Sequence, residues 1–205
     1  MQHARIQALR GRAHLQQGAS LIIVMLILII VSILGAGGAQ IALMSERGAR
    51  NDRDMQLAWQ SAEAALMDAE YDIHEPGSGR AAAFGAANNV NAFVGGCGNT
   101  GINRGLCALG ETGKPAWLTV DFTDASGGAR TAAFGDFTGR AFAADNNRIA
   151  SGIQPARKPR YVIEPITDPG NRDLSAPSSF LYRVTAMGFG PRDDIQAVSQ
   201  IIYRN

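Results

Sequence analysis

An uncharged, largely apolar run of 26 residues, Ala19 to Met44, constrains this chain more than any other feature. It exceeds the roughly 20 residues that a helix needs to cross a hydrocarbon core of about 30 Å. Three arginines and no acidic residue precede the run, whereas acidic and basic residues mix after it. Because positive charge marks the cytoplasmic side, we predict a membrane-spanning helix with a cytoplasmic N-terminus and an exported remainder.

The small residues that could mark a cleavage site stand before this run instead of behind it. An ordinary secretory signal has an apolar region of about 7 to 15 residues, followed by a small-x-small cleavage site. Here Gly18, Ala19 and Ser20 precede the long stretch. A peptidase at the cytoplasmic membrane face would therefore remove residues 1–18 as a leader and leave the helix on the mature protein, as in type IV pilin-like precursors. The alternative is an uncleaved anchor with a single span.

The apolar pattern continues beyond Met44 with a heptad-like stripe. Its members follow one another in steps of four and three: Met55, Trp59, Ala62, Leu66, Ala69 and Ile73. One helix over residues 19–74 would be about 84 Å long, more than a bilayer requires. We predict a membrane or filament-core part over residues 19–44 and an amphipathic part over 45–75. The amphipathic part is expected to pack mainly on the chain's own domain, and the membrane part on helices of other subunits once it leaves lipid.

Several segments resemble the PilX-type minor pilins of the type IV pilus. At the N-terminal side these are Gln17 to Leu21 and Asp54 to Glu70, and at the C-terminal side Pro159 to Pro165, Tyr182 to Pro191 and Ser199 to Arg204. The resemblance implies cleavage after Gly18 by the prepilin peptidase and N-methylation of Ala19. It also implies partners: other minor pilins, the major pilin, the inner membrane and a large adhesin at the pilus tip.

One position departs from the usual pilin pattern. Most pilins carry a glutamate at the fifth residue of the mature chain, where it can neutralise the buried N-terminal amine of a neighbouring subunit; here that residue is Ile23. A buried unpaired ammonium is costly, so a subunit that docks beneath another should bring a carboxylate. We therefore expect a place at or near the filament tip, in a complex that primes assembly. The alternative is that the site simply tolerates isoleucine.

Residues 76–205 are long enough for one compact exported domain. Cys97 and Cys107 are the only cysteines and enclose a short glycine-rich loop, so in an exported domain we expect a disulfide that contributes about 3 kcal/mol. Free or partner-bonded thiols are the alternative. Without the leader the chain has 16 basic and 18 acidic residues, and no basic stripe that would indicate nucleic-acid binding.

Four segments rich in β-branched and aromatic residues predict strands. They are Trp117 to Phe122, Arg160 to Ile166, Phe180 to Phe189 and Ile195 to Tyr203, the last two as a hairpin. Together with the long helix they indicate an α+β, pilin-like fold, in which the helix packs on a small antiparallel sheet.

No pattern in the sequence indicates catalysis. Gly96, Gly98 and Gly101 have the spacing of a dinucleotide fingerprint but straddle a cysteine in a loop. His74 is the only histidine outside the leader, and the aspartates 121, 124 and 136 lack the EF-hand spacing. We predict a non-enzymatic protein without cofactor or metal. Two alternatives to the pilus role are a tip pseudopilin of a type II secretion system and a monomeric, membrane-anchored periplasmic binding protein.

Overall fold

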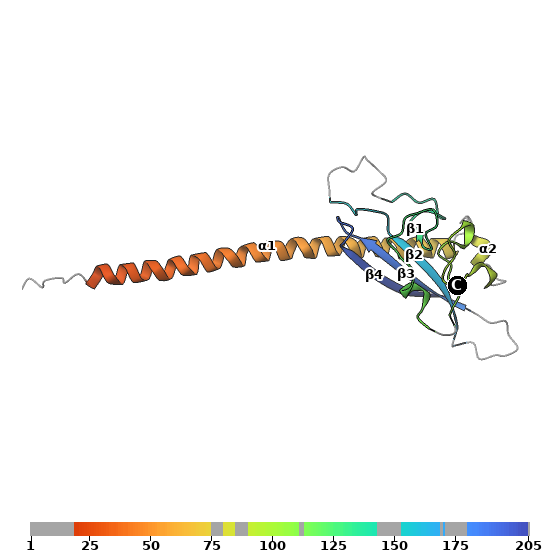
Figure 1. Ribbon diagram of the computed structural model, residues 1–205, viewed down its shortest axis with the longest axis horizontal. Coiled ribbons are helices and arrows are strands. Elements are labelled where there is room, and N and C mark those ends of the chain that lie inside the picture. The colour runs from red at the N-terminus through yellow and green to blue at the C-terminus, as the bar shows by residue number, and fades with distance from the viewer. Residues whose placement is uncertain are drawn as a thin grey trace, which may run out of the picture. The chain divides into compact units, whose positions relative to one another are not determined.

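The computed structural model describes residues 19–74, 80–84, 90–110, 113–142, 153–168, 170 and 180–204. Its helices are α1 (Ala19–His74) and α2 (Ala81–Phe84), with the 3-10 turns η1 (Val90–Ala92), η2 (Gly101–Asn103) and η3 (Ala116–Leu118). Its strands are β1 (Ala132–Ala133), β2 (Arg160–Thr167), β3 (Phe180–Phe189) and β4 (Gln196–Arg204) (Figure 1). The chain divides after Ala49 into two units, of which the first holds the apolar part of α1.

Helix α1 has the predicted bounds and runs over 56 residues. In the first unit its large apolar side chains are all strongly exposed, from 48% at Ile30 to 71% at Ile41. Among the described residues, α1 is the one helix that is long and apolar enough to cross a membrane. The surface of this unit therefore needs lipid or other apolar helices around it.

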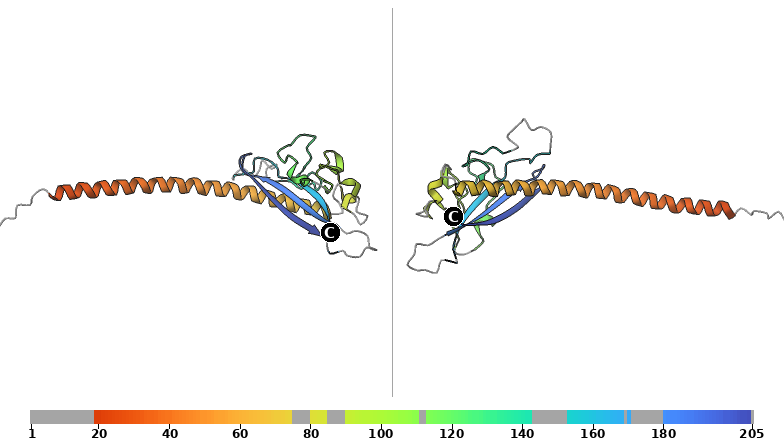
Figure 2. Two further views of the ribbon diagram at one scale, coloured as in Figure 1. Left: turned by 60° about the horizontal axis from the view of Figure 1, so that its bottom comes forward. Right: turned by 180° about the vertical axis from the view of Figure 1, so that it is seen from behind.

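The second unit is built on a four-stranded antiparallel sheet in the order β1-β2-β3-β4. Strands β2, β3 and β4 lie where the sequence predicted them, to within one residue at each end, and β3 and β4 form the predicted hairpin. The predicted α+β fold, with a long helix packed on a small antiparallel sheet, is thus confirmed (Figure 2).

The strand predicted from Trp117 to Phe122 is wrong. Pro115 and Ala116 carbonyls accept hydrogen bonds from Leu118 and Thr119 amides, which closes the 3-10 turn η3. The apolar residues that suggested a strand instead cover the face of the sheet that points away from α1, where Phe122 packs with Val162. We call this the distal face. The sheet takes its fourth strand from Ala132–Ala133, which is too short to show in the sequence.

The other face of the sheet receives the C-terminal part of α1 through small residues. The helix buries four alanines completely: Ala58, Ala62, Ala65 and Ala69. The backbones come closest at Gly188 of β3, where an added Cβ would lie 2.2 Å from both the Ala58 carbonyl oxygen and the Ala62 amide nitrogen. No side chain fits at such a contact, so the fold requires glycine there.

This close approach rotates the buried side of α1 away from part of the predicted stripe. Ala62, Ala69 and Ile73 are buried and Leu66 is half-buried, whereas Met55 and Trp59 are 38% and 46% exposed. Large side chains do not fit where two backbones lie so close together. The structure therefore buries Ala58 and Ala65 beside the predicted Ala62 and Ala69, and it leaves Met55 and Trp59 exposed.

Candidate functional site

The residues that the sequence singled out at the N-terminus lie at the start of α1. Gly18 is outside the described residues, and Ala19 is the first residue of the helix. Ile23 is 58% exposed within a surface that carries no charge from Leu21 to Met44. The amine that cleavage after Gly18 would create would thus belong to a helix that offers no carboxylate of its own nearby.

Cys97 and Cys107 form a disulfide in the second unit. The loop that it closes is tight: a Cβ on Gly98 would lie 2.2 Å from the Asn103 carbonyl oxygen, and Gly96 and Gly101 have φ angles of 69° and 53°. These glycines are needed by the path of the loop. Their dinucleotide-like spacing therefore has a purely conformational explanation.

The disulfide loop is attached to the outer edge of β2. The Cys107 amide donates to the Ile163 carbonyl at 2.9 Å, and the Ile163 amide donates to the Gly105 carbonyl at 2.8 Å. Strand β1 pairs with the same edge at Arg160 and Tyr161. The chain thereby supplies hydrogen-bond partners along this edge.

Arg80 joins this loop to α1 from a fully buried position. Its guanidinium pairs with the equally buried carboxylate of Asp72, and the Tyr161 hydroxyl donates to the same carboxylate at 3.0 Å. The guanidinium also donates to the backbone carbonyl of Arg104 and stacks 3.7 Å from the centre of the Phe137 ring. Burial, and then the Asp72 charge, raise the pKa of Tyr161 well above its usual range. Breaking such a pair is expected to cost about 3 to 5 kcal/mol.

Asp68, one helical turn before Asp72, is a second buried acid on α1. It accepts hydrogen bonds from the Gly135 amide at 2.8 Å and the Thr138 hydroxyl at 2.5 Å. Burial raises the pKa of Asp68 despite these hydrogen bonds and the nearby Arg140. The carboxylate holds the turn that follows β1 against the helix.

A third buried acid, Glu164 of β2, secures the distal face. It accepts a hydrogen bond from the Ala116 amide at 3.1 Å and one from Arg183 Nε at 3.0 Å. Glu164 thus connects turn η3 to the strand pair β2–β3. Its counter-charge Arg183 is partly exposed, so the pair is anchored in the sheet and not wholly removed from solvent.

Sequence reasoning assigned no role to these acids. In the sequence Asp68 and Asp72 are polar residues between members of the apolar stripe, yet both are completely buried. A signal was present: the two acids are four residues apart and share one helix face, and Glu164 is surrounded by apolar residues within a strand. Their positively charged partners, however, are close only in the folded chain.

The groups considered for metal binding are used by local turns. Asp121 accepts from the Thr123 amide, Asp124 from the Ser126 amide, and Asp136 from the Ala133 amide. Hydrogen bonds from Thr123 lower the pKa of Asp121. Across the described residues, no three His, Cys, Asp or Glu side chains come together as metal ligands would.

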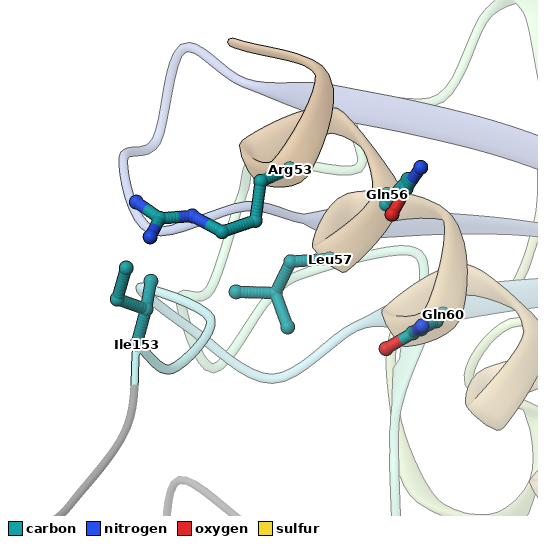
Figure 3. A pocket seen from close by; sticks show the side chains of 5 residues that line it. All are labelled: Arg53, Gln56, Leu57, Gln60 and Ile153. Carbon is teal, nitrogen blue, oxygen red and sulfur yellow. The ribbon is translucent and has the colours of Figure 1, made fainter. Parts of the chain in front are cut away.

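An open cavity of about 390 Å³ lies beside α1 (Figure 3). Its lining consists of Arg53, Gln56, Leu57, Gln60 and Ile153. Arg53 and Leu57 extend from the helix toward Ile153, as the close view shows. This lining contains no carboxylate, thiol or imidazole, and so it lacks the groups of a general acid, base or nucleophile.

Two family models match the chain. The model of the PilX N-terminal region matches residues 17–66, and the model described as "Type IV pilus assembly protein PilX C-term" matches residues 103–205. No curated protein and no solved structure matched. The first match contains the start of the apolar helix and the buried alanines Ala58, Ala62 and Ala65 of α1, and the second contains the whole sheet. The chain therefore belongs to the PilX family, and it is a membrane-anchored minor pilin of the type IV pilus that interacts with other pilus components.

Proposed function

We propose that this minor pilin occupies the tip of the filament, where it helps to prime assembly and to present an adhesin. The observation that carries the proposal is the uncharged surface of α1 around Ile23. In the proposed mature chain, which begins at Ala19 after removal of the leader, Ile23 is the fifth residue. The subunit would be exported with its sheet domain in the periplasm before it enters the pilus.

The physical reason concerns the charge of the new N-terminus. A subunit inserted below another must compensate the ammonium of the subunit above it, since an unpaired buried charge costs several kcal/mol. Ile23 has no group that can do so. A subunit with nothing above it escapes this requirement, and its own Ala19 amine can still pair with a carboxylate of the subunit below.

The exposed apolar surface supports the remainder of the proposal. Large side chains from Leu21 to Met44 are exposed in the isolated chain, and in a filament they would be covered by helices of the major pilin and the other minor pilins. Once the helix has left lipid, burying this surface is favourable by roughly 25 cal/mol per Å² of apolar area, so packing on helices of other subunits stabilises the extracted subunit. The sheet domain would then be available to contact the adhesin.

Substitution of Ile23 by glutamate tests the tip position. The variant should enter the shaft, so the ratio of this subunit to major pilin in sheared filaments should rise about tenfold or more, since 1.4 kcal/mol corresponds to a factor of ten. Ile22→Glu is the matched control, because Ile22 is similarly exposed and adjacent but one position away. Filaments in which Ile23→Glu and Ile22→Glu leave the ratio equally unchanged would contradict a tip position.

The proposed processing has its own test. The intact mass and N-terminal peptide should be measured in cells with and without the prepilin peptidase. We expect a chain that begins with N-methylated Ala19 when the peptidase is present. An intact leader in both cells would remove the filament proposal and leave a plain membrane anchor.

A further inference from the structure

Strand β4 forms the second edge of the sheet, and within the described residues it pairs only with β3. The register is unbroken over nine residue pairs, from Leu181 opposite Arg204 to Phe189 opposite Gln196. In an antiparallel edge strand, every second residue directs its amide and carbonyl away from the sheet. Figure 2 shows β4 at the side of the sheet opposite β2.

The sequence of β4 lacks the features that usually protect an edge. From Gln196 to Tyr203 there is no charged residue, proline or glycine, and the pairing contains no bulge. Soluble proteins ordinarily discourage edge-to-edge pairing with an edge lysine, a proline, a bulge or a covering loop. Eight uncharged residues in regular register are therefore suited to receive another strand.

The side chains beside this edge are apolar and exposed. Val198 and Ile202 share the distal face and are 42% and 58% exposed, and Ile201 on the other face is 41% exposed. Next to Val198 lies an open cavity of about 370 Å³. Its lining includes Trp117, Leu118, Val120, Met187, Gln196 and Val198. An apolar side chain from an added strand could lean into this cavity across Val198.

We propose that the outer edge of β4 accepts an extended strand from a neighbouring pilus subunit. The occupant is an uncharged segment of about eight residues with apolar side chains at alternate positions, matching the length and pattern of the edge. Within β4 and its turn, the charged side chains lie at the two ends, at Arg204 and in the turn with Arg192 and Asp194. Beside the strand, Asp121 lines the cavity and Arg183 of β3 stands opposite Ile202, where it pairs with Glu164. The inference rests on the proposed pilus function, because that function supplies the neighbouring subunit.

A partner subunit fits this edge better than a second copy of the chain. Pairing of two identical edges about a two-fold axis would produce a closed dimer, whereas a filament grows through contacts between different surfaces. If the β4 edge receives a different segment of another subunit, the contact does not close into a dimer, and further subunits can be added to the filament.

The test uses the full-length chain, co-expressed with the other minor pilins and the major pilin of the same cells and purified in detergent. Hydrogen exchange over Gln196 to Arg204 should be compared between the chain alone and the assembled complex. We expect the outward amides of β4 to exchange about tenfold more slowly, or slower still, in the complex. Contact through side chains alone would not slow these backbone amides.

Two matched variants accompany the exchange measurement. Ile202→Lys places a charge at the edge and should reduce the yield of co-purified pilins by about tenfold. Leu109→Lys makes the same change at a residue that is 46% exposed but lies away from β4, and it should leave the yield unchanged. Thermal unfolding of both variants should match the unmodified chain, since both side chains are exposed.

Three results would overturn the proposal. Complex formation with unchanged exchange in β4 would refute the strand addition and leave the pilus function intact. Protection that appears in the chain alone and grows with its concentration would identify a second copy as the occupant. If the unmodified chain co-purifies with no other pilin, this inference and the proposed function are both refuted.

Discussion

The two edges of the sheet differ in how the chain completes them. Along β2, the disulfide loop bonds to Ile163 and β1 pairs with Arg160 and Tyr161. Along the outer side of β4, no described segment supplies hydrogen-bond partners. This strand is uncharged over eight residues. A disulfide and a buried ion pair stabilise the segments that cover the edge at β2. In our proposal the first edge serves stability, whereas the second is available for assembly.

The largest effect is expected at Arg80, which ties the closed edge to α1. Arg80→Met should lower the free energy of unfolding by about 3 to 5 kcal/mol, because it leaves the Asp72 carboxylate buried without its counter-charge. Urea unfolding of the full-length chain in detergent measures the loss. The double variant Arg80→Met, Asp72→Asn should recover part of it. A loss below about 1 kcal/mol would mean that solvent reaches Asp72 and that the pair does not secure this edge.

Removal of the disulfide should have the next largest effect. The double variant Cys97→Ser, Cys107→Ser should lose about 3 kcal/mol, because the unfolded chain gains the freedom that the bridge removes. Hydrogen exchange at Ile163 should accelerate, since its amide donates to Gly105 within the loop. Exchange along β4 should accelerate less. Equal acceleration at both edges would show that the bridge stabilises the sheet as a whole and would weaken the comparison.

A smaller, pH-dependent effect is expected at Asp68, which holds the turn after β1. Burial raises its pKa in the folded chain, so the folded state binds the proton more tightly than the unfolded state. The stabilisation is complete below the unfolded pKa, near 3.9, and is lost as the pH rises through the folded pKa. Asp68→Asn does not titrate, so it should gain stability relative to the unmodified chain as the pH rises from about 4.

Thermal unfolding of the two proteins at several pH values measures this difference. Its size should be on the order of 1 kcal/mol, because asparagine keeps an oxygen that can accept from Gly135 or Thr138. A difference that does not change with pH would show that Asp68 is ionised equally in both states.

The smallest effect on stability is expected at the open edge. Val198→Thr should change the free energy of unfolding by no more than about 0.5 kcal/mol, since Val198 is already exposed. Val184→Thr on β3 is the control: it makes the same exchange at a fully buried position and should cost about 1 to 3 kcal/mol. Similar losses at both sites would show that β4 is covered in the isolated chain.

The sequence predicted the parts of the fold that local patterns determine. The uncharged run from Ala19 to Met44 allowed only a long apolar helix, and Phe180 to Phe189 combined strand-forming residues with a following turn. Trp117 to Phe122 has a similar composition but forms a turn after Pro115. Composition alone does not distinguish an apolar strand from an apolar segment that covers a sheet.

The sequence predicted the buried side of α1 only in part: Ala62, Ala69 and Ile73 of the stripe are buried, but a distant residue decides the rest. Spacing favoured Met55 and Trp59, but the approach of Gly188 leaves room only for alanine. The Asp72–Arg80–Tyr161 cluster was missed for a related reason: its members come from three separate segments. The proposed features at Gly18, Ala19 and Ile23 depend on other proteins and remain predictions.

Gly188 also bears on how this domain carries mechanical load. Any pull along α1 reaches the sheet domain through the contacts between the helix and the sheet. At Gly188 the strand backbone lies against the backbone of α1 between Ala58 and Ala62. A shift of one residue, about 1.5 Å along the helix, would drive an alanine methyl group into the strand. The contact at Gly188 would therefore resist sliding of α1 along the sheet.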